Sequence, residues 1–319
     1  MKKKLSVSVV ITTFNGERFI EEQLDSIRTQ SRKPDEVLIF DDVSNDRTAQ
    51  LVEEYIKKYN ITDCWTLEVN PYNKGYAQNY VDSITRARSD LIFLCDQDDI
   101  WVHDKIEKMT SIMENKNSIG LLCSNLEPYY YEEGGRKWDK KDIDAMKNDG
   151  TLEYPIFSYN TFFLQRSGCT MCVRKEYFNK IKSFWIEGWA HDDFLWKFAL
   201  ADKCLAIYEY TTLKRRMHKN NASTLNIRTR DWRIEQIEGL IHQGSILKCY
   251  VGNKCTEKQV EEIINKNLSC LYQRKNMLET KNLFRFILIV ARYRKCFPRM
   301  KAVLLDLYLT IFNQYNGIE

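Results

Sequence analysis

The sequence predicts an α/β fold with a mostly parallel sheet, helices on both faces of the sheet and a C-terminal helical region. Three observations predict it. Short β-branched or apolar runs alternate with stretches of helical periodicity, and two of those runs end directly in paired acidic residues. From Arg230 the strand-like runs stop and the helical pattern continues to the end. Strand–helix alternation of this kind is typical of parallel strands joined by crossover helices.

The first part of the chain alternates strictly. The predicted strands are 7–12, 36–40, 65–69 and 91–95. One helix is predicted from Glu17, a second after the capping run 44–46, and a third over 76–88. The first helix has apolar residues at helical spacing and is followed by Pro34, which favours a helix end shortly before it. This order predicts a sheet of the Rossmann type.

The later part is less regular. The polar stretch 129–151 is predicted to be an exposed loop, 168–173 a strand, and 175–184 and 190–201 helices. Late strands are expected at 204–208 and 211–217, and no strand is expected after Arg230. The chain therefore divides into a domain of residues 1–225 and a helical region of residues 226–319.

Composition excludes several classes of protein. The 319 residues are 44% hydrophobic and 29% charged, with a net charge of +4, which is ordinary for a globular protein and too small to indicate nucleic-acid binding. Ten scattered cysteines include one C-x-x-C, Cys169 and Cys172, without a second pair, so we expect reduced thiols, no zinc site and a cytoplasmic location. The basic start leads into an alternating run, which indicates a strand rather than a signal peptide. No window reaches the roughly 20 apolar residues of a membrane span.

The run after the predicted strand 91–95 holds three carboxylates, Asp96, Asp98 and Asp99. Carboxylates beside a core need a cation, hydrogen-bond donors or water. In open α/β sheets, ligands bind beyond the carboxyl ends of the strands, and aspartates at i and i+2 can share Mg²⁺ or Mn²⁺. The alternative is an acidic turn in which Asp98 or Asp99 caps the next helix.

The strand 36–40 also ends in acids, Asp41 and Asp42. If both strands are parallel in one sheet, the two acidic pairs lie on the same rim. One pair could accept hydrogen bonds from a nucleobase or ribose, and the other could hold a metal on a diphosphate. The chain has no glycine-rich phosphate loop, which makes a metal the natural group to neutralise the phosphates.

Four ordered motifs carry a resemblance to a known family. They are Val9-x-Ile11-Thr12-Thr13-Phe14-Asn15, Asp41-Asp42-x-Ser44-x-Asp46, Asn73-x-Gly75-x-x-x-Asn79 and Asp96-Gln97-Asp98-Asp99-Ile100-Trp101. Together they resemble the family 2 glycosyltransferases with the GT-A fold, and the fourth is most similar to that of bacterial rhamnosyltransferase-type members. The resemblance covers about residues 5–225.

The family places a catalytic base in a short acidic motif at the head of a helix, and Asp192 in the run 189–194 matches it. An inverting transfer needs a base that takes the proton of the acceptor hydroxyl, and burial against Trp189 or Phe194 would raise the pKa of this carboxyl. Two alternatives stay open. Asp193 could be the base, or the two acids could only cap the helix.

A fifth stretch resembles the family's Tyr-Arg-x-His-x-x-Asn segment, with Arg216, His218 and Asn221 in register. Arg215 stands where Tyr is usual, and Ser223 or Thr224 where Gly is common. By this resemblance Arg216 would contact the β-phosphate, and His218 would be a metal ligand or a phosphate donor. The alternative for His218 is a solvated surface position.

The resemblance implies a nucleotide-diphosphate-sugar donor (dTDP- or UDP-linked, with rhamnose favoured by the motif), a divalent Mg²⁺ or Mn²⁺, and inversion at the anomeric carbon. The acceptor would be a bacterial surface polysaccharide, such as a capsule or O antigen, or a lipid-linked glycan. The implied donor-binding residues are Thr12, Phe14, Asn15, Asp41, Asp42, Asn79, Asp96, Asp98 and Arg216, and the implied metal ligands are Asp96, Asp98 and His218.

The C-terminal region mixes dense apolar content with basic residues, with six Lys or Arg against two acids from Leu283 onward. One interpretation is an amphipathic segment at the cytoplasmic membrane surface. The other is a helical hairpin that packs on the catalytic domain or on a second subunit. Three other functions stay open: a phosphatase with an Asp-x-Asp strand end, a nucleotidyltransferase, and a non-catalytic sugar-binding protein.

Overall fold

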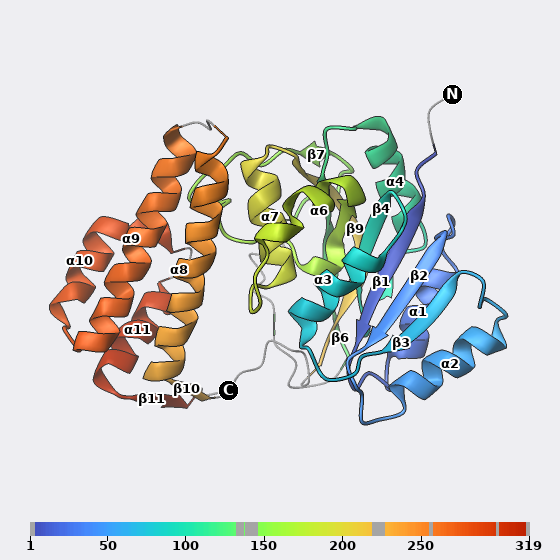
Figure 1. Ribbon diagram of the computed structural model, residues 1–319, viewed down its shortest axis with the longest axis horizontal. Coiled ribbons are helices and arrows are strands. Elements are labelled where there is room, and N and C mark those ends of the chain that lie inside the picture. Colours follow the sequence, from blue (N-terminus) through green and yellow to red (C-terminus); the bar gives the residue numbers. More distant parts are fainter. Residues whose placement is uncertain are drawn as a thin grey trace. The chain divides into compact units, whose positions relative to one another are not determined.

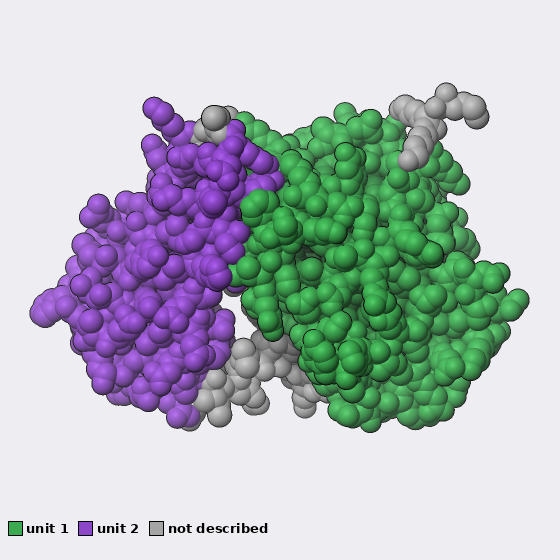
Figure 2. Space-filling model, viewed as in Figure 1, with its two compact units in different colours: residues 1–155, 164–221 green, residues 156–163, 222–319 purple. Residues whose placement is uncertain are grey.

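The computed structural model describes residues 4–131, 137, 146–218, 227–254, 258–297 and 300–316. The chain forms two compact units, one of residues 1–155 and 164–221 and one of residues 156–163 and 222–319 (Figure 2). We call them the sheet unit and the helical unit. The predicted boundary between residues 225 and 226 lies outside the described residues.

The sheet unit is built on one mixed, mostly parallel sheet. Its strands are β1 (Val7–Thr13), β2 (Glu36–Asp41), β3 (Trp65–Val69), β4 (Leu91–Asp96), β5 (Ile100–Trp101), β6 (Leu121–Tyr130), β7 (Leu152–Glu153), β8 (Met171–Arg174) and β9 (Leu205–Met217). They lie in the order β3-β2-β1-β4-β8-β6-β9-β5, with β7 paired to β9. The first four are parallel to one another, β6 is parallel to β9, and β8 runs antiparallel between β4 and β6.

Helices cover this sheet (Figure 1), and their buried apolar residues complete its core. They are α1 (Ile20–Arg28), α2 (Thr48–Lys58), α3 (Tyr76–Arg86), α4 (Lys105–Asn115), α6 (Lys175–Ile181) and α7 (His191–Ala201), with short 3₁₀ turns η1 (Gly168–Thr170) and η2 (Lys182–Phe184). Helix α1 shows why they pack: Ile20, Leu24 and Ile27 recur at i, i+4 and i+7 and are all fully buried. The predicted α/β fold is confirmed.

The register of β1 places the two acidic strand ends on one rim. Thr13 of β1 pairs with Asp41 of β2, and Thr12 pairs with Asp96 of β4. Because all three strands are parallel, both acidic ends lie at the carboxyl edge of the sheet. The expectation drawn from the sequence, that the acids share a rim, is confirmed.

Four details of the prediction for the sheet unit were wrong. The expected strands 204–208 and 211–217 form one strand, β9, because bulges between Ser124 and Leu126 absorb the irregularity in its pairing with β6. Residues 168–170 form the turn η1, in which Thr170 Oγ1 donates to the carbonyl of Ser167 at 2.7 Å. Tyr129 and Tyr130, expected in a loop, belong to β6. The first helix begins at Ile20 rather than Glu17.

The helical unit contains α8 (Arg230–Gly252), α9 (Lys258–Thr280), α10 (Phe284–Tyr293), the turn η3 (Arg294–Cys296) and α11 (Lys301–Ile311). The expectation of no strand after Arg230 was wrong. β10 (Ile227–Thr229) pairs antiparallel with β11 (Gln314–Asn316), so backbone pairing joins the two ends of the unit. Among the described residues, no helix is long and apolar enough to cross a membrane.

Candidate active site

Asp41, at the end of β2, uses its carboxylate to build the loop that follows it. Its Oδ1 accepts from the hydroxyls of Thr13 at 2.8 Å and Ser44 at 2.6 Å, and its Oδ2 accepts from the Ser44 backbone N–H at 2.8 Å. Val43, which lies between Asp41 and Ser44 in the chain, has φ = 64°. This left-handed conformation is energetically unfavourable for a β-branched residue. This predicted donor-binding carboxylate is thus buried and fully engaged within the protein.

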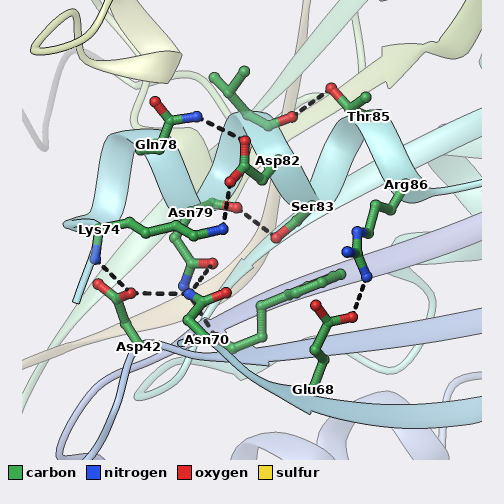
Figure 3. Close-up of polar contacts among 12 residues, drawn as sticks. Asp42, Glu68, Asn70, Lys74, Gln78, Asn79, Asp82, Ser83, Thr85 and Arg86 are labelled. Atoms are coloured by element: carbon green, nitrogen blue, oxygen red, sulfur yellow. Dashed lines mark hydrogen bonds and ion pairs between the residues drawn. The ribbon is translucent and has the colours of Figure 1, made fainter. Parts of the chain in front are cut away.

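Asp42 is engaged in the same way. Its Oδ1 accepts from the Asn70 amide at 2.9 Å and from the Lys74 backbone N–H at 2.8 Å (Figure 3). Its Oδ2 accepts from the Gly75 N–H at 2.8 Å. Gly75 has φ = 77° and immediately precedes α3. Asp42 therefore fixes the turn that starts α3.

Asn79 belongs to the same network. Its Oδ1 accepts from Asn70 at 3.0 Å and its Nδ2 donates to the carbonyl of Phe40 at 3.1 Å, and the side chain is 1% exposed (Figure 3). In this structure Asn79 ties α3 to β2, and its amide faces protein rather than solvent.

The residues predicted at the end of β1 form the other wall of the rim. Gln97 binds the Phe14 backbone, accepting from its N–H at 2.8 Å and donating to its carbonyl at 3.0 Å, and Phe14 is 44% exposed. Asn15, with φ = 51°, accepts from the Asn45 N–H at 2.8 Å. Thr12 is half-buried beside Asp96. Phe14 is the exposed aromatic surface of this group.

The end of β4 differs from the end of β2 because its carboxylates keep unused oxygens. Asp96 Oδ1 accepts from the Tyr80 hydroxyl at 2.6 Å. Asp99 is 1% exposed, and its Oδ2 has no hydrogen-bond partner among the described residues. Oxygens of Asp96 and Asp99 and the Cys169 sulfur lie within 4.8 Å of one another. Burial, and then the charge of Asp98, raise the pKa of Asp99 well above its usual range.

Asp98 and His218 meet although 120 positions separate them, with His218 Nε2 and Asp98 Oδ2 2.7 Å apart. His218 is buried, so its alternative placement on the solvated surface was wrong. The predicted register partner Asn221, with Ser223 and Thr224, lies outside the described residues. Carboxylate oxygens and an imidazole nitrogen form a donor set that fits Mn²⁺ or Mg²⁺. The oxygen of Asp99 without a described partner lies near Asp96 and is consistent with a cation at this rim.

Arg216 is 1% exposed and bonded within the protein. Its Nε donates to the carbonyl of Asp98 at 3.0 Å, its Nη2 pairs with Glu22, and its guanidinium lies 4.6 Å from the centre of the Phe19 ring. These contacts hold the Asp98 backbone. The predicted phosphate-binding arginine thus acts, in this structure, on the loop after β4.

Arg215 precedes Arg216 in β9, so its side chain points to the opposite face of the sheet. The sequence analysis did not select Arg215 as a site residue. Its Nη1 donates to Ser167 Oγ at 2.8 Å. Burial lowers its pKa, but Cys169 and the carboxylates Asp96 and Asp99 raise it more, so the net pKa is raised. Arg215 is a half-buried cation at the acidic rim. In the sequence, its difference from the family's usual Tyr at this position could have identified it as a candidate site residue.

The two candidate bases at the start of α7 have different surroundings. Asp193 Oδ2 accepts from Trp189 Nε1 at 2.8 Å and from Lys197 Nζ at 2.7 Å. Asp192 accepts only the backbone N–H of Asp193, at 2.8 Å, in the hydrogen bonds described. Burial raises the pKa of Asp192, which suits a group that must accept a proton near neutral pH.

Tyr80 and His191 bridge the distance between the β4 rim and α7. The Tyr80 hydroxyl donates to Asp96, and its ring centre lies 3.9 Å from that of His191, which directly precedes Asp192. His191 is 5% exposed, and neither ring nitrogen has a hydrogen-bond partner among the described residues. A Cβ on Gly168 would lie 2.5 Å from His191 Nε2. The imidazole therefore fills the space between Tyr80 and η1, and burial lowers its pKa, which favours the neutral ring.

Comparisons with known proteins show which family and which solved structures the chain is similar to. The profile of the family "Glycosyl transferase family 2" matches residues 8–182, more than half of the chain. The dTDP-rhamnosyl transferase RfbG of Shigella flexneri is 30% identical over 228 residues, which cover 68% of this chain and 74% of RfbG.

The fold is shared with solved structures, of which two are compared. TarS 1–349 of Staphylococcus aureus, in complex with UDP-GlcNAc, superposes with a TM-score of 0.62 at 17% identity and covers 95% of this chain and 90% of TarS 1–349. The mannosyltransferase PcManGT of Pyrobaculum calidifontis, in complex with GDP-Man and Mn²⁺, gives a TM-score of 0.53 at 16% identity and covers 97% of this chain and 81% of PcManGT.

Proposed function

This chain belongs to glycosyl transferase family 2, and we propose that it is an inverting, metal-dependent enzyme that moves a sugar from a nucleotide-diphosphate donor to a bacterial glycan. Family membership decides against the phosphatase, the nucleotidyltransferase and the non-catalytic sugar-binding protein. One observation carries the mechanistic part of the proposal: a carboxylate rim with unused oxygens, at Asp96 and Asp99, is joined through Tyr80 and His191 to a second carboxylate, Asp192.

We assign the general base to Asp192. Among the described residues its carboxylate has only one hydrogen bond, whereas Asp193 is held by Trp189 and Lys197. A base must have a free lone pair and a pKa near the working pH, and burial raises the pKa of Asp192. Asp192 would take the proton of the acceptor hydroxyl while the hydroxyl attacks the anomeric carbon opposite the departing diphosphate. Asp193 then serves to hold the start of α7.

The residues that would hold the metal are Asp96, Asp98 and His218. When bound there, a divalent cation supplies positive charge that stabilises the diphosphate as it leaves. Arg215 would add a permanent charge at the same rim, since its guanidinium neighbours these carboxylates. Arg216 would act indirectly, by holding the Asp98 backbone through its 3.0 Å hydrogen bond.

For the donor, we propose that the exposed Phe14 ring and the backbone of the Asp41–Asp42 loop receive the nucleotide, with Thr12 beside Asp96. Asp41, Asp42, Asn15 and Asn79 would contribute mainly by shaping that loop, because their side chains bond to protein groups.

The similarity to RfbG favours dTDP-rhamnose as the donor. The acceptor would be a surface polysaccharide or lipid-linked glycan. We also propose a cytoplasmic location, where nucleotide sugars are made, and the nine described cysteines are all unpaired.

The experiment is a thermal-shift screen of the full-length protein with dTDP-rhamnose, UDP-GlcNAc and GDP-mannose, each with and without Mn²⁺. We expect one donor to raise the melting temperature only when Mn²⁺ is present, because a ligand that binds only the folded state stabilises it. Asp98→Asn should abolish that shift, and Glu53→Gln, on the exposed face of α2, should not. Stabilisation by a donor that is equal with and without Mn²⁺, or no stabilisation by any donor, would contradict the proposal.

A further inference from the structure

Helix α10 of the helical unit presents an apolar face to solvent. Phe284, Ile287 and Leu288 are 83%, 67% and 42% exposed, and their i, i+3, i+4 spacing places them side by side on one face. The opposite face buries Ile289 and Tyr293 in a cluster with Met277 of α9. The helix is therefore apolar on both sides, whereas a helix at the surface of a globular protein is normally polar on its outer side.

The exposed charges of the chain segment that carries this face have one sign. The exposed charged residues described between 281 and 316 are all basic: Lys281, Arg292, Arg294, Lys295 and Lys301. The single acid described there, Asp306, is 0% exposed and is bonded to Arg233 at 2.7 Å and Arg274 at 2.6 Å. The outer surface of this segment thus offers positive charge next to exposed apolar side chains.

We propose that the outer face of α10 docks on the surface of an anionic phospholipid membrane. Phe284, Ile287 and Leu288 enter the boundary between headgroups and acyl chains, while Arg292 and Lys295 contact lipid phosphates. A helix with exposed aromatic and aliphatic residues flanked by basic residues has the composition of interfacial helices, and each basic residue near an anionic leaflet strengthens binding.

The charge of this face favours an anionic membrane over a second copy of the chain as its binding partner. In a two-fold dimer the same patch meets itself, so the basic patch of one copy would face the basic patch of the other, and like charges across an interface are unfavourable. A membrane with anionic headgroups supplies the opposite charge. The inference does not depend on the proposed activity, although a lipid-linked acceptor would be found at the same surface.

The test is co-sedimentation of the full-length protein with phosphatidylglycerol vesicles and with phosphatidylcholine vesicles. We expect binding to the anionic vesicles at least tenfold stronger than to the neutral ones, and weaker binding as salt is raised. The double variant Phe284→Ser/Ile287→Ser should lose at least tenfold in binding. The variant Arg292→Glu/Lys295→Glu should lose the preference for anionic vesicles, since each basic residue contributes about fivefold.

Ile156→Ser is the matched control, because Ile156 is 78% exposed, belongs to the same unit and lies outside α10; its binding should equal that of the wild type. Circular dichroism and light scattering of every variant establish that it is folded and report its oligomeric state. Equal binding to both kinds of vesicle, or unchanged binding by both double variants, would overturn the proposal. So would a stable wild-type dimer that Phe284→Ser/Ile287→Ser dissociates.

Discussion

The ends of β2 and β4 look alike in sequence and differ in chemistry. Both are acidic, both strands pair with β1, and both acidic ends lie on one rim. Asp41 and Asp42 each accept three hydrogen bonds from side chains and backbone N–H groups. Asp96 accepts one from Tyr80, and Asp99 keeps a buried oxygen without a described partner. A carboxylate whose oxygens are all engaged builds a loop, whereas one with an unused oxygen can bind a ligand.

The same contrast separates the neighbours Asp192 and Asp193. Among the residues that the structure describes, Asp193 accepts hydrogen bonds from two side chains and Asp192 accepts one from a backbone N–H. In both regions the number of protein donors around a carboxylate, rather than its place in a motif, distinguishes a structural acid from a candidate catalytic one. Paired substitutions test this distinction.

The largest expected difference is between Asp96→Asn and Asp42→Asn. Asp96→Asn should lower sugar transfer by about a thousandfold or more, because the loss of a metal ligand removes several kcal/mol of stabilisation of the leaving group. It should change the free energy of unfolding little, because the amide oxygen can still accept from the Tyr80 hydroxyl. Asp42→Asn should instead destabilise the protein by about 1–3 kcal/mol, because an amide cannot accept from all of the donors that face Asp42. Turnover assays and urea unfolding of both variants measure the difference, and similar stability losses in the two would contradict it.

Next in size is the pair Asp192→Asn and Asp193→Asn. The first should lower transfer by about 10²–10⁴-fold, as removal of a general base does. Because burial raises the folded-state pKa of Asp192 above its unfolded value, its contribution to stability is complete below the unfolded pKa and is lost as pH rises through the folded pKa. Asp192→Asn should therefore unfold at a higher temperature than the wild type at neutral pH.

Asp193→Asn should do the reverse, lowering the melting temperature because it weakens the bond to Lys197. Wild-type transfer should also increase as pH rises through the raised pKa of Asp192, because only the deprotonated carboxylate accepts a proton. A pH–rate profile that Asp192→Asn leaves unchanged in shape would assign the base to another residue.

A smaller effect is expected at the bridge between the two regions. His191→Ala should lower kcat by about tenfold to a hundredfold through misplacement of Asp192, without weakening the binding of the nucleoside diphosphate with Mn²⁺. His191→Phe keeps a ring against Tyr80 and should recover most of kcat. Equal losses in the two variants would mean that an imidazole nitrogen, not the shape of the ring, is required.

The smallest effect is expected at Val43, in the loop that Asp41 builds. Its φ of 64° suits glycine, so Val43→Gly should raise the free energy of unfolding by up to about 1 kcal/mol, the relief of left-handed strain less the entropy cost of glycine. Val69→Gly, at the end of β3 with 51% exposure, is the control and should destabilise. Chemical denaturation compares the two, and destabilisation by both would show that Val43 is not strained.

Much of this molecule is readable from local pattern. The apolar runs and helical spacings located the strands and helices of the parallel half of the sheet, since strand and helix periodicities are properties of short segments. The weakest predictions fell where partners are distant: β11 has three residues and no strand-like pattern, and it forms because β10 lies against it. Continuous β9 likewise depends on the bulged partner β6.

The sequence by itself determined the fold class, the family, and the residue types that can hold a metal or take a proton. Only the tertiary structure decided which of them keep unused atoms: Asp42 meets Asn70, Asp98 meets His218, and Arg215 meets Ser167, each across many positions of chain. The physical reason is that a hydrogen-bond acceptor is available to a ligand only when the folded chain has not already filled it, and the filling donors come from elsewhere in the sequence.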